Sequence, residues 1–258
     1  MEYLVNLSKT TNHPRNYAAT WVIAILKDDM ATAPPDQSFG LKDQIILASA
    51  SPRRKELLAR LGVAFEVLVA PITEHEDPAA EPRVMVLHNA ALKAEWVCGQ
   101  RPGALVLSAD TTVALDDHVL NKPADLAEAR AMLKRLSGRT HTVYTGVCLW
   151  RRPGGPEISH CETSRVTFRT LDDATIARYF TLVNPLDKAG AYGIQEGREL
   201  ILESYTGSLS NIMGLPVEWL AQQLHGLALI PSPVAPTIED SRFHARNAAT
   251  AADPARPA

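Results

Sequence analysis

Strands and helices follow one another irregularly along this chain, and that irregular order constrains the fold more than any other feature. Apolar runs predict strands over residues 45–48, 63–69, 104–107, 140–150, 158–169 and 200–205. Start signals and helical spacing predict helices from Ser51-Pro52, over 85–97, from Asp125, from Asp172 and over 212–224. Because no strict strand–helix–strand alternation recurs, we expect an α/β fold with a mixed, twisted sheet flanked by helices.

Hydropathy divides the 258 residues into three parts. Residues 44–227 hold all the predicted elements, and a composition of 46% hydrophobic and 21% charged residues is that of an ordinary globular chain. Residues 1–43 have no sustained period, and residues 228–258 are rich in Ala and Pro. We therefore predict a poorly ordered N-terminal extension over 1–43, one folded domain over 44–227 and a C-terminal tail over 228–258.

Charge and cysteine content exclude several classes of protein. The formal net charge is −3, so no overall positive field attracts nucleic acid or an anionic membrane. No apolar run reaches the 18 residues that a membrane-spanning helix needs. Cys98, Cys148 and Cys161 form no C-x-x-C pair, which disfavours a disulfide scaffold or a zinc ribbon and predicts a reducing, cytoplasmic location.

The strand-to-helix turn over residues 49–54, Ser-Ala-Ser-Pro-Arg-Arg, predicts a phosphate-binding site. Free backbone N–H groups at the start of a helix, two hydroxyls and the guanidiniums of Arg53 and Arg54 would converge there. The alternative is a helix cap with two solvated arginines, and the pattern alone favours neither. No G-x-x-x-x-G-K-[ST] sequence occurs, so the turn is not a Walker loop.

Other polar clusters are weaker signals by themselves. Asp110, with Thr111 and Thr112, follows an apolar run and could bind a metal or orient water, although a lone Asp more often starts a turn. Lys122, held beside Pro123, and the glycine-containing segment 184–195 are candidates for binding, with a solvated lysine and a plain turn as the alternatives. The acidic tract over 74–77 could hold a divalent cation or be merely solvated.

Six motifs follow one another in a fixed order, at residues 47–54 (LASASPRR), 109–111 (ADT), 122–123 (KP), 136–141 (LSGRTH), 185–190 (PLDKAG) and 214–216 (GLP). Together they resemble the Maf family of nucleoside triphosphate pyrophosphatases. The resemblance implies hydrolysis of a nucleoside triphosphate to the monophosphate and pyrophosphate with a divalent metal, usually Mg²⁺. It also implies a mixed α/β fold with a central cleft between two lobes, and a homodimer.

The same resemblance implies roles for individual residues. Asp110 matches the proton acceptor, and Glu74 with Asp110 is the implied metal site. The remaining matches are substrate-binding residues: Ser49, Arg53 and Arg54 in the phosphate loop, Lys93 and Lys122 as further polar groups, and Arg53, Thr111 and Gln195 as the specificity positions of the dTTP/UTP subgroup. Thr73, where an acidic residue is usual, and residues 196–199 depart from the pattern; the first bears on metal binding and the second on base preference.

The sequence leaves three functions to be compared. The leading one is hydrolysis of dTTP and UTP, with modified pyrimidine nucleotides as further candidates. The second is the same reaction on 7-methyl-GTP or another non-standard nucleotide. The third is a non-catalytic, nucleotide-sensing regulator of cell division, which the intact set of charged residues disfavours.

Overall fold

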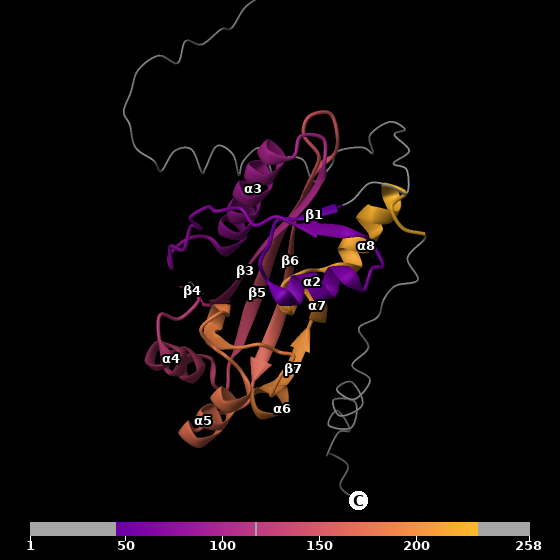
Figure 1. Ribbon diagram of the computed structural model, residues 1–258. Helices are drawn as coiled ribbons and strands as arrows, with labels where there is room; N and C mark the ends of the chain where they lie inside the picture. Colours follow the sequence, from indigo (N-terminus) through magenta and orange to yellow (C-terminus); the bar gives the residue numbers. More distant parts are fainter. Residues whose placement is uncertain (1–44, 117, 232–258) are drawn as a thin grey trace, which may run out of the picture. The chain divides into compact units, whose positions relative to one another are not determined.

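The computed structural model describes residues 45–116 and 118–231 (Figure 1). The predicted N-terminal extension and all of the predicted tail beyond residue 231 lie outside the described residues. Leu229 and Ile230 still pack against the hydrophobic core. The chain therefore stays packed beyond residue 227, where the sequence predicted that the tail begins.

One mixed sheet forms the centre of the described structure. Its strands are β1 (Ile45–Leu47), β2 (Phe65–Val67), β3 (Leu105–Leu115), β4 (His118–Leu120), β5 (Thr140–Trp150), β6 (Glu157–Phe168) and β7 (Leu202–Thr206). The strand order is β2-β1-β3-β5-β6-β7, with β4 pairing to β3. β1 runs parallel to β2 and to β3, whereas the other pairs are antiparallel. The mixed α/β fold predicted from the sequence is confirmed.

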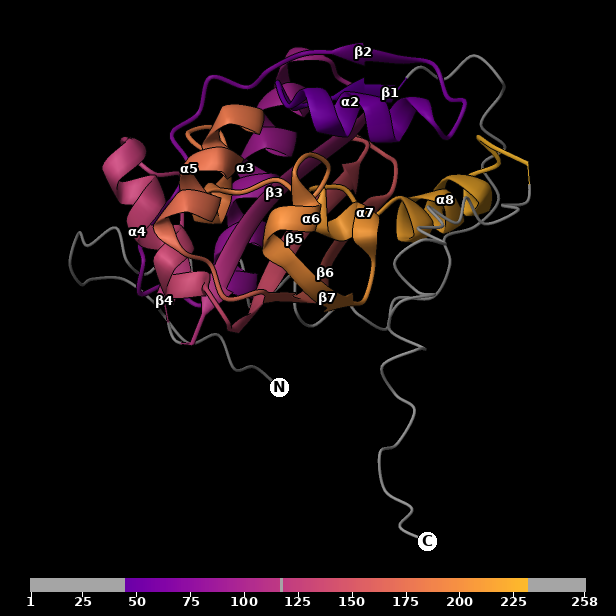
Figure 2. The same cartoon turned by 90° about the horizontal axis from the view of Figure 1, so that it is seen from below.

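Helices cover both faces of this sheet. They are α2 (Pro52–Ala59), α3 (Pro82–Gln100), α4 (Leu126–Leu136), α5 (Asp173–Leu182), α6 (Arg198–Ile201), α7 (Leu209–Ile212) and α8 (Val217–Gly226), with a 3₁₀ turn η1 (Ala189–Ala191). α3 lies on one face, and α2 and α8 lie on the other (Figure 1). α4 and α5 gather at the β4 end of the sheet (Figure 2). The caps predicted at Asp125 and Asp172 are present, since Asp125 accepts from the N–H of Glu128 and Asp172 from that of Thr175. Ser51 stands at the N-cap position of α2, but its side chain makes no capping hydrogen bond.

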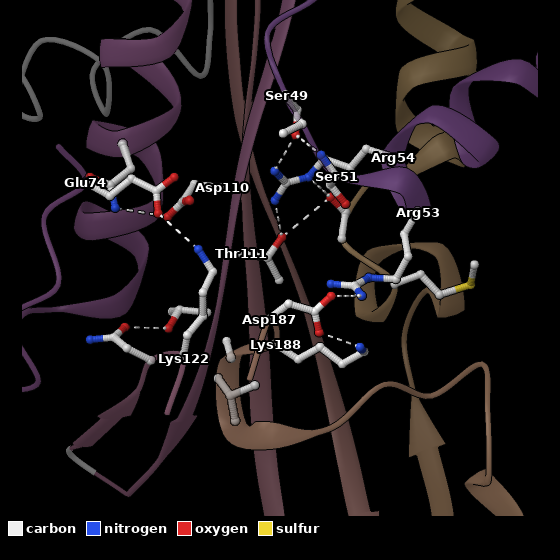
Figure 3. Close-up of a pocket in the computed structure, with 18 of the residues that line it drawn as sticks. Ser49, Ser51, Arg53, Arg54, Glu74, Asp110, Thr111, Lys122, Asp187 and Lys188 are labelled. Carbon is white, nitrogen blue, oxygen red and sulfur yellow. Dashed lines mark hydrogen bonds and ion pairs between the residues drawn. The ribbon is translucent and has the colours of Figure 1, made fainter. Parts of the chain in front are cut away.

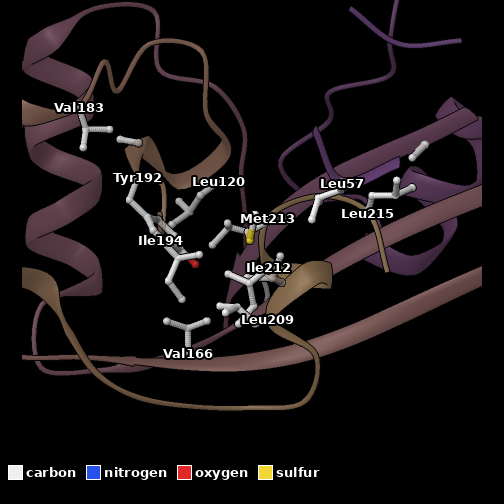
Figure 4. Close-up of a cluster of buried hydrophobic side chains, with 14 of the residues drawn as sticks. Leu57, Leu120, Val166, Val183, Tyr192, Ile194, Leu209, Ile212, Met213 and Leu215 are labelled. Atoms are coloured by element: carbon white, nitrogen blue, oxygen red, sulfur yellow. The ribbon is translucent and has the colours of Figure 1, made fainter. Parts of the chain in front are cut away.

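Alternating side chains of the strands separate two hydrophobic cores. Ile45, Leu105 and Leu107 belong to the larger core on the α2 and α8 side, part of which Figure 4 shows. Ile46 and Val106 belong to the smaller core under α3. Because successive side chains of a strand point to opposite faces, the even-numbered positions of β3 face α3.

Gly146 lets α3 lie directly on the sheet. A Cβ atom at this position of β5 would lie 2.5 Å from the carbonyl oxygen of Val86, in the first turns of α3. No side chain fits in that space. Glycine at 146 therefore sets how close α3 comes to β5, and so how far its polar side chains reach toward β3.

Two sequence predictions about elements were wrong. The strand predicted over 104–107 continues to Leu115, so Asp110 lies in the middle of a strand rather than after it. The cause is tertiary: β3 pairs with β5 along this whole polar stretch. The helix predicted over 212–224 is instead two helices, because Gly214 has a φ of 106° and Pro216 follows it. No helix in the described ranges 45–116 and 118–231 is long and apolar enough to cross a membrane.

Candidate active site

A pocket of about 430 Å³ opens beside the middle of β3. In the described part of the chain, β3 pairs with β1 only up to Leu107 and with β4 only from Val113, which leaves one edge open between them. The segments 48–54 and 69–76 contribute lining residues from the β1 end, and the segments 121–122 and 187–195 contribute them from the β4 end. The volume lies within the range of about 300–1,000 Å³ typical of small-molecule sites.

The pocket wraps around the open edge of β3, so neighbouring residues of the strand serve its two sides. Asp110 points toward α3, while Thr111 points to the opposite face (Figure 3). Figure 3 shows Glu74 and Lys122 on the Asp110 side, and Ser49, Arg53 and Arg54 on the Thr111 side. The structure thus brings all nine residues predicted from the sequence to one pocket. Eight of them lie in these two groups, and the ninth, Gln195, also lines the pocket.

Lys93, Asp110 and Glu74 form the first group, which we call the acid centre. The ammonium of Lys93 lies 2.8 Å from Asp110 Oδ1 and 2.7 Å from Glu74 Oε1. It also donates to the carbonyl oxygen of Ala109 at 3.2 Å. Lys93 is 7% exposed and Asp110 is 8% exposed, so two buried opposite charges are paired rather than isolated, as buried charges must be.

Glu74 connects the acid centre to the second lysine. Its Oε2 lies 3.5 Å from Nζ of Lys122, whose side chain is half exposed. Partial burial raises the pKa of the Glu74 carboxyl, but the charge and hydrogen bond of Lys93 and then the charge of Lys122 outweigh that effect, so the net pKa lies below its usual value. Glu74 is therefore a carboxylate at neutral pH.

Asn89 is a member of this site that the sequence motifs did not reveal. It lies on α3 four residues before Lys93 and is 1% exposed. Its amide nitrogen donates to Asp110 Oδ2 at 3.0 Å. The signal that would have found it is spacing, because residues four apart on a helix share a face.

The second group consists of Ser49, Arg53, Arg54 and Thr111. We call residues 49–54 the phosphate loop, and Arg54 holds this loop in place. Its Nε donates to the carbonyl oxygen of Gly214, Nη1 to Ser49 Oγ and Nη2 to Thr111 Oγ1, at 2.8, 3.1 and 3.0 Å. Burial lowers the pKa of the Arg54 guanidinium, and the charges of Asp110 and Glu74 counter this only in part. Three of its five N–H groups are thus used by the protein, so Arg54 joins the walls of the pocket.

Arg53 has a different environment from Arg54. Its side chain is about one-quarter exposed, and within residues 45–116 and 118–231 it pairs only with the exposed Asp187, at 3.8 Å. The backbone N–H of Ser51 points back to Ser49 Oγ at 3.3 Å, which shapes the turn before α2. Of the two arginines, Arg53 is the one whose guanidinium is more available to an incoming anion.

The segment over residues 189–195, which we call the base loop, carries Gln195 into the pocket. Gln195 is exposed, and its amide makes no hydrogen bond with any residue that the structure describes. The hydroxyl of Tyr179 on α5 both donates to the carbonyl oxygen of Gly193 and accepts from its N–H, each at 2.9 Å. Tyr192 is held by a 2.8 Å contact between its hydroxyl and Nε2 of His141. A free amide thus projects from an anchored backbone.

The acid centre fits a divalent cation that arrives with a substrate better than a resident one. Glu74 and Asp110 carry two negative charges and Lys93 one positive charge, so a net charge of about −1 remains. Among the described residues, no group of three or more His, Cys, Asp or Glu could hold a metal by itself. Mg²⁺ is commonly bound by one or two carboxylates together with substrate phosphates, and the two carboxylates meet that requirement.

Known proteins match this chain over the whole region that forms the fold. A family model described as Maf-like protein matches residues 44–227. A protein of Akkermansia muciniphila named dTTP/UTP pyrophosphatase is 44% identical over 183 residues, which cover 71% of this chain and 96% of that protein. Proteins of the same name from Symbiobacterium thermophilum and Myxococcus xanthus are 46% and 50% identical, and the matches cover 70% and 67% of this chain and 92% and 87% of those proteins.

Proposed function

The chain belongs to the Maf family, and we propose that it is a pyrophosphatase that hydrolyses dTTP and UTP to the nucleoside monophosphate and pyrophosphate. The observation that carries the proposal is that one pocket joins a buried carboxylate, Asp110, to a phosphate loop in a chain 44–50% identical to proteins of that name. Hydrolysis of a triphosphate needs both an oriented water and a cradle for several phosphates.

We assign phosphate binding to Arg53, Ser49 and the N-terminus of α2. A helix N-terminus presents free N–H groups and a partial positive charge to an anion. Arg53 adds a guanidinium that can grip phosphate oxygens in a bidentate manner. Arg54 supports this loop by holding Ser49 and Thr111 in place.

Asp110 is the proton acceptor in the proposed reaction. The oxygen of a water molecule bonds to the α-phosphorus, the bond from that phosphorus to the bridging oxygen of the pyrophosphate breaks, and the water proton passes to Asp110. Lys122 and Arg53 stabilise the negative charge that develops on the leaving pyrophosphate. A Mg²⁺ ion held by Glu74 and Asp110 would add neutralisation of phosphate charge.

Gln195 is the residue that we assign to reading the base. Its amide offers one acceptor and two donors, so it can pair with N3–H and a carbonyl oxygen of uracil or thymine. The extra methyl group of thymine changes affinity by only about 1–3 kcal/mol, which explains why both bases would be accepted. Cytosine reverses the hydrogen-bonding pattern at N3 and C4 and leaves groups unpaired.

Pyrophosphate release from a panel of nucleotides tests this function. With Mg²⁺ present, we expect the purified protein to prefer dTTP and UTP over CTP and 7-methyl-GTP. Asp110→Asn keeps the shape of the side chain, and we expect it to lower kcat by about 100-fold or more, the scale of general-base catalysis. A preference for 7-methyl-GTP would refute the base assignment, and binding without turnover would favour the nucleotide-sensing alternative.

A homodimer and a cytoplasmic location stay predictions from the family resemblance and the cysteine content. Light scattering on the full-length chain gives the molar mass in solution directly. A mass of twice 28.1 kDa would support the dimer, and a single 28.1 kDa species at micromolar concentration would contradict it.

A further inference from the structure

Asn89 carries a buried side-chain amide whose donors and acceptor all have hydrogen-bond partners. None of the hydrolytic steps proposed above uses it. Its nitrogen donates to Asp110 Oδ2 and to the carbonyl oxygen of His75, each at 3.0 Å. Its oxygen accepts from the backbone N–H of His75 at 2.8 Å. An amide group has two N–H donors and one carbonyl acceptor, so every part of it has a partner.

These partners fix the orientation of the amide. Rotation by 180° would turn the amide oxygen toward the carboxylate of Asp110 and the carbonyl oxygen of His75, which are both acceptors. It would also turn the NH₂ group toward the N–H of His75. The hydrogen-bond network therefore admits only one of the two amide orientations.

The same amide holds both carboxylates of the acid centre. It binds Asp110 directly, while Lys93, one turn further along α3, binds the other oxygen of that carboxylate at 2.8 Å. It holds Glu74 indirectly, because it ties both backbone groups of the next residue, His75. With its two oxygens held from α3, the carboxylate plane of Asp110 is fixed relative to the water it is proposed to activate.

We propose that Asn89 is a positioning residue that orients Asp110 and the backbone beside Glu74 for hydrolysis. This inference rests on the proposed function. Asparagine suits the position because one short side chain must donate twice and accept once: aspartate offers no donor when ionised, and leucine of similar size offers neither. Misplacement of a reacting group by about 1 Å can cost about 100-fold in rate, so a buried positioning residue has a measurable effect.

Two variants of Asn89 and one matched control test the proposal. Asn89→Leu removes all three hydrogen bonds at similar volume, and Asn89→Asp keeps an acceptor for His75 N–H but loses both donors. Ser108→Ala is the control, because Ser108 is buried on β3 and donates to the carbonyl oxygen of Ala90 on α3 without lining the pocket. For UTP we expect either Asn89 variant to lower kcat by about 10–100-fold with KM changed less than about threefold, and Ser108→Ala to change kcat less than about twofold.

A double-mutant cycle separates positioning from general loosening. If Asn89 acts through Asp110, Asn89→Leu should lower the residual kcat of Asp110→Asn by less than about twofold. The same large factor in both backgrounds, or a loss found entirely in KM, would overturn the inference. If Asn89→Leu does not fold, which its melting curve will show, Asn89→Asp takes its place in the cycle.

Hydrogen–deuterium exchange makes the inference testable apart from the substrate. In Asn89→Leu we expect faster exchange in a peptide covering residues 73–77 and no change in that peptide in Ser108→Ala. If the wild-type protein hydrolyses neither dTTP nor UTP, the proposed function fails, while this exchange result still reports on the tether. Unchanged exchange over 73–77 would show that Asn89 does not hold the segment beside Glu74.

Discussion

Removal of the Tyr179 hydroxyl should loosen the base loop while leaving the fold intact. Tyr179 is fully buried, and burial raises the pKa of its hydroxyl, so the group stays protonated and able to donate. Tyr179→Phe keeps the ring and its packing but removes two hydrogen bonds of 2.9 Å to the backbone of Gly193. The change therefore separates anchoring of the loop from filling of the core.

The expected loss of stability follows from those two bonds. A buried hydrogen bond contributes about 0.5–1.5 kcal/mol net, so the two together contribute about 1–3 kcal/mol. For a domain of this size, each kcal/mol lowers Tm by about 2–4 °C, which gives a decrease of about 2–12 °C. Differential scanning calorimetry on the full chain measures it.

The same variant should reduce discrimination between bases. Gln195 lies two residues after Gly193 and is itself unanchored, so the backbone of the base loop fixes its position. If about 1 kcal/mol of that preorganisation is lost, the ratio of kcat/KM for UTP to that for CTP falls about fivefold.

A matched tyrosine provides the control for this prediction. The hydroxyl of Tyr144 on β5 makes no hydrogen bond with any residue in the described ranges, so Tyr144→Phe should change neither Tm nor the ratio. If Tyr179→Phe also leaves both quantities at their wild-type values, the claim that Tyr179 anchors the base loop is refuted.

Three further changes test other parts of the structure. Burial lowers the pKa of His141 to about 3 from 6.5. Between pH 6.5 and about 3 the unfolded chain therefore binds more protons than the folded one. His141 thus lowers the free energy of unfolding by up to about 1.4 kcal/mol for each pH unit below 6.5. His141→Gln should flatten that acid slope in urea titrations, and an unchanged slope would show that the site titrates normally. Gln195→Glu should change the ranking of UTP, dTTP and CTP in kcat/KM, and an unchanged ranking would mean that Gln195 does not read the base. Trimming the chain to residues 45–231 should preserve Tm and activity. Ending it at residue 227 instead removes Leu229 and Ile230 and should lower the free energy of unfolding by about 1–3 kcal/mol. Equal Tm values for the two lengths would contradict the packing of these two residues on the core.

The sequence predicted most elements because their signals are local. Asp125 and Asp172 cap helices where the pattern placed them, since a cap depends on residues three apart. Asp110 was placed after a strand because polar residues usually end an apolar run. Only pairing with β5, through Gly146, extends the strand across this stretch. That pairing depends on residues 36 positions away, which periodicity does not report.

The candidate site was predicted in its charged members and missed in its supporting ones. Asp110, Lys122 and Arg53 lie in motifs that can be recognised as such. Asn89 and Tyr179 each act through two hydrogen bonds to the backbone of one residue 14 positions away. Ordinary hydrophobic spacing hides such residues, because a buried amide or tyrosine on a helix gives the same pattern whether or not its polar end reaches a functional loop.

The position of Asp110 within β3 affects how the substrate preference of this protein can evolve. An amide in the middle of a central strand exchanges its hydrogen only when much of the fold opens, whereas loops open separately at low cost. Asp110 is paired with Gly146 in the ladder, so its geometry is as durable as the sheet itself. The base loop lies outside that ladder. Under the roles proposed for Gln195 and Asp110, substitutions in the base loop alter which nucleotide is accepted and leave the strand with the proton acceptor intact. A lineage built on this fold can then exchange one substrate for another and keep its chemistry.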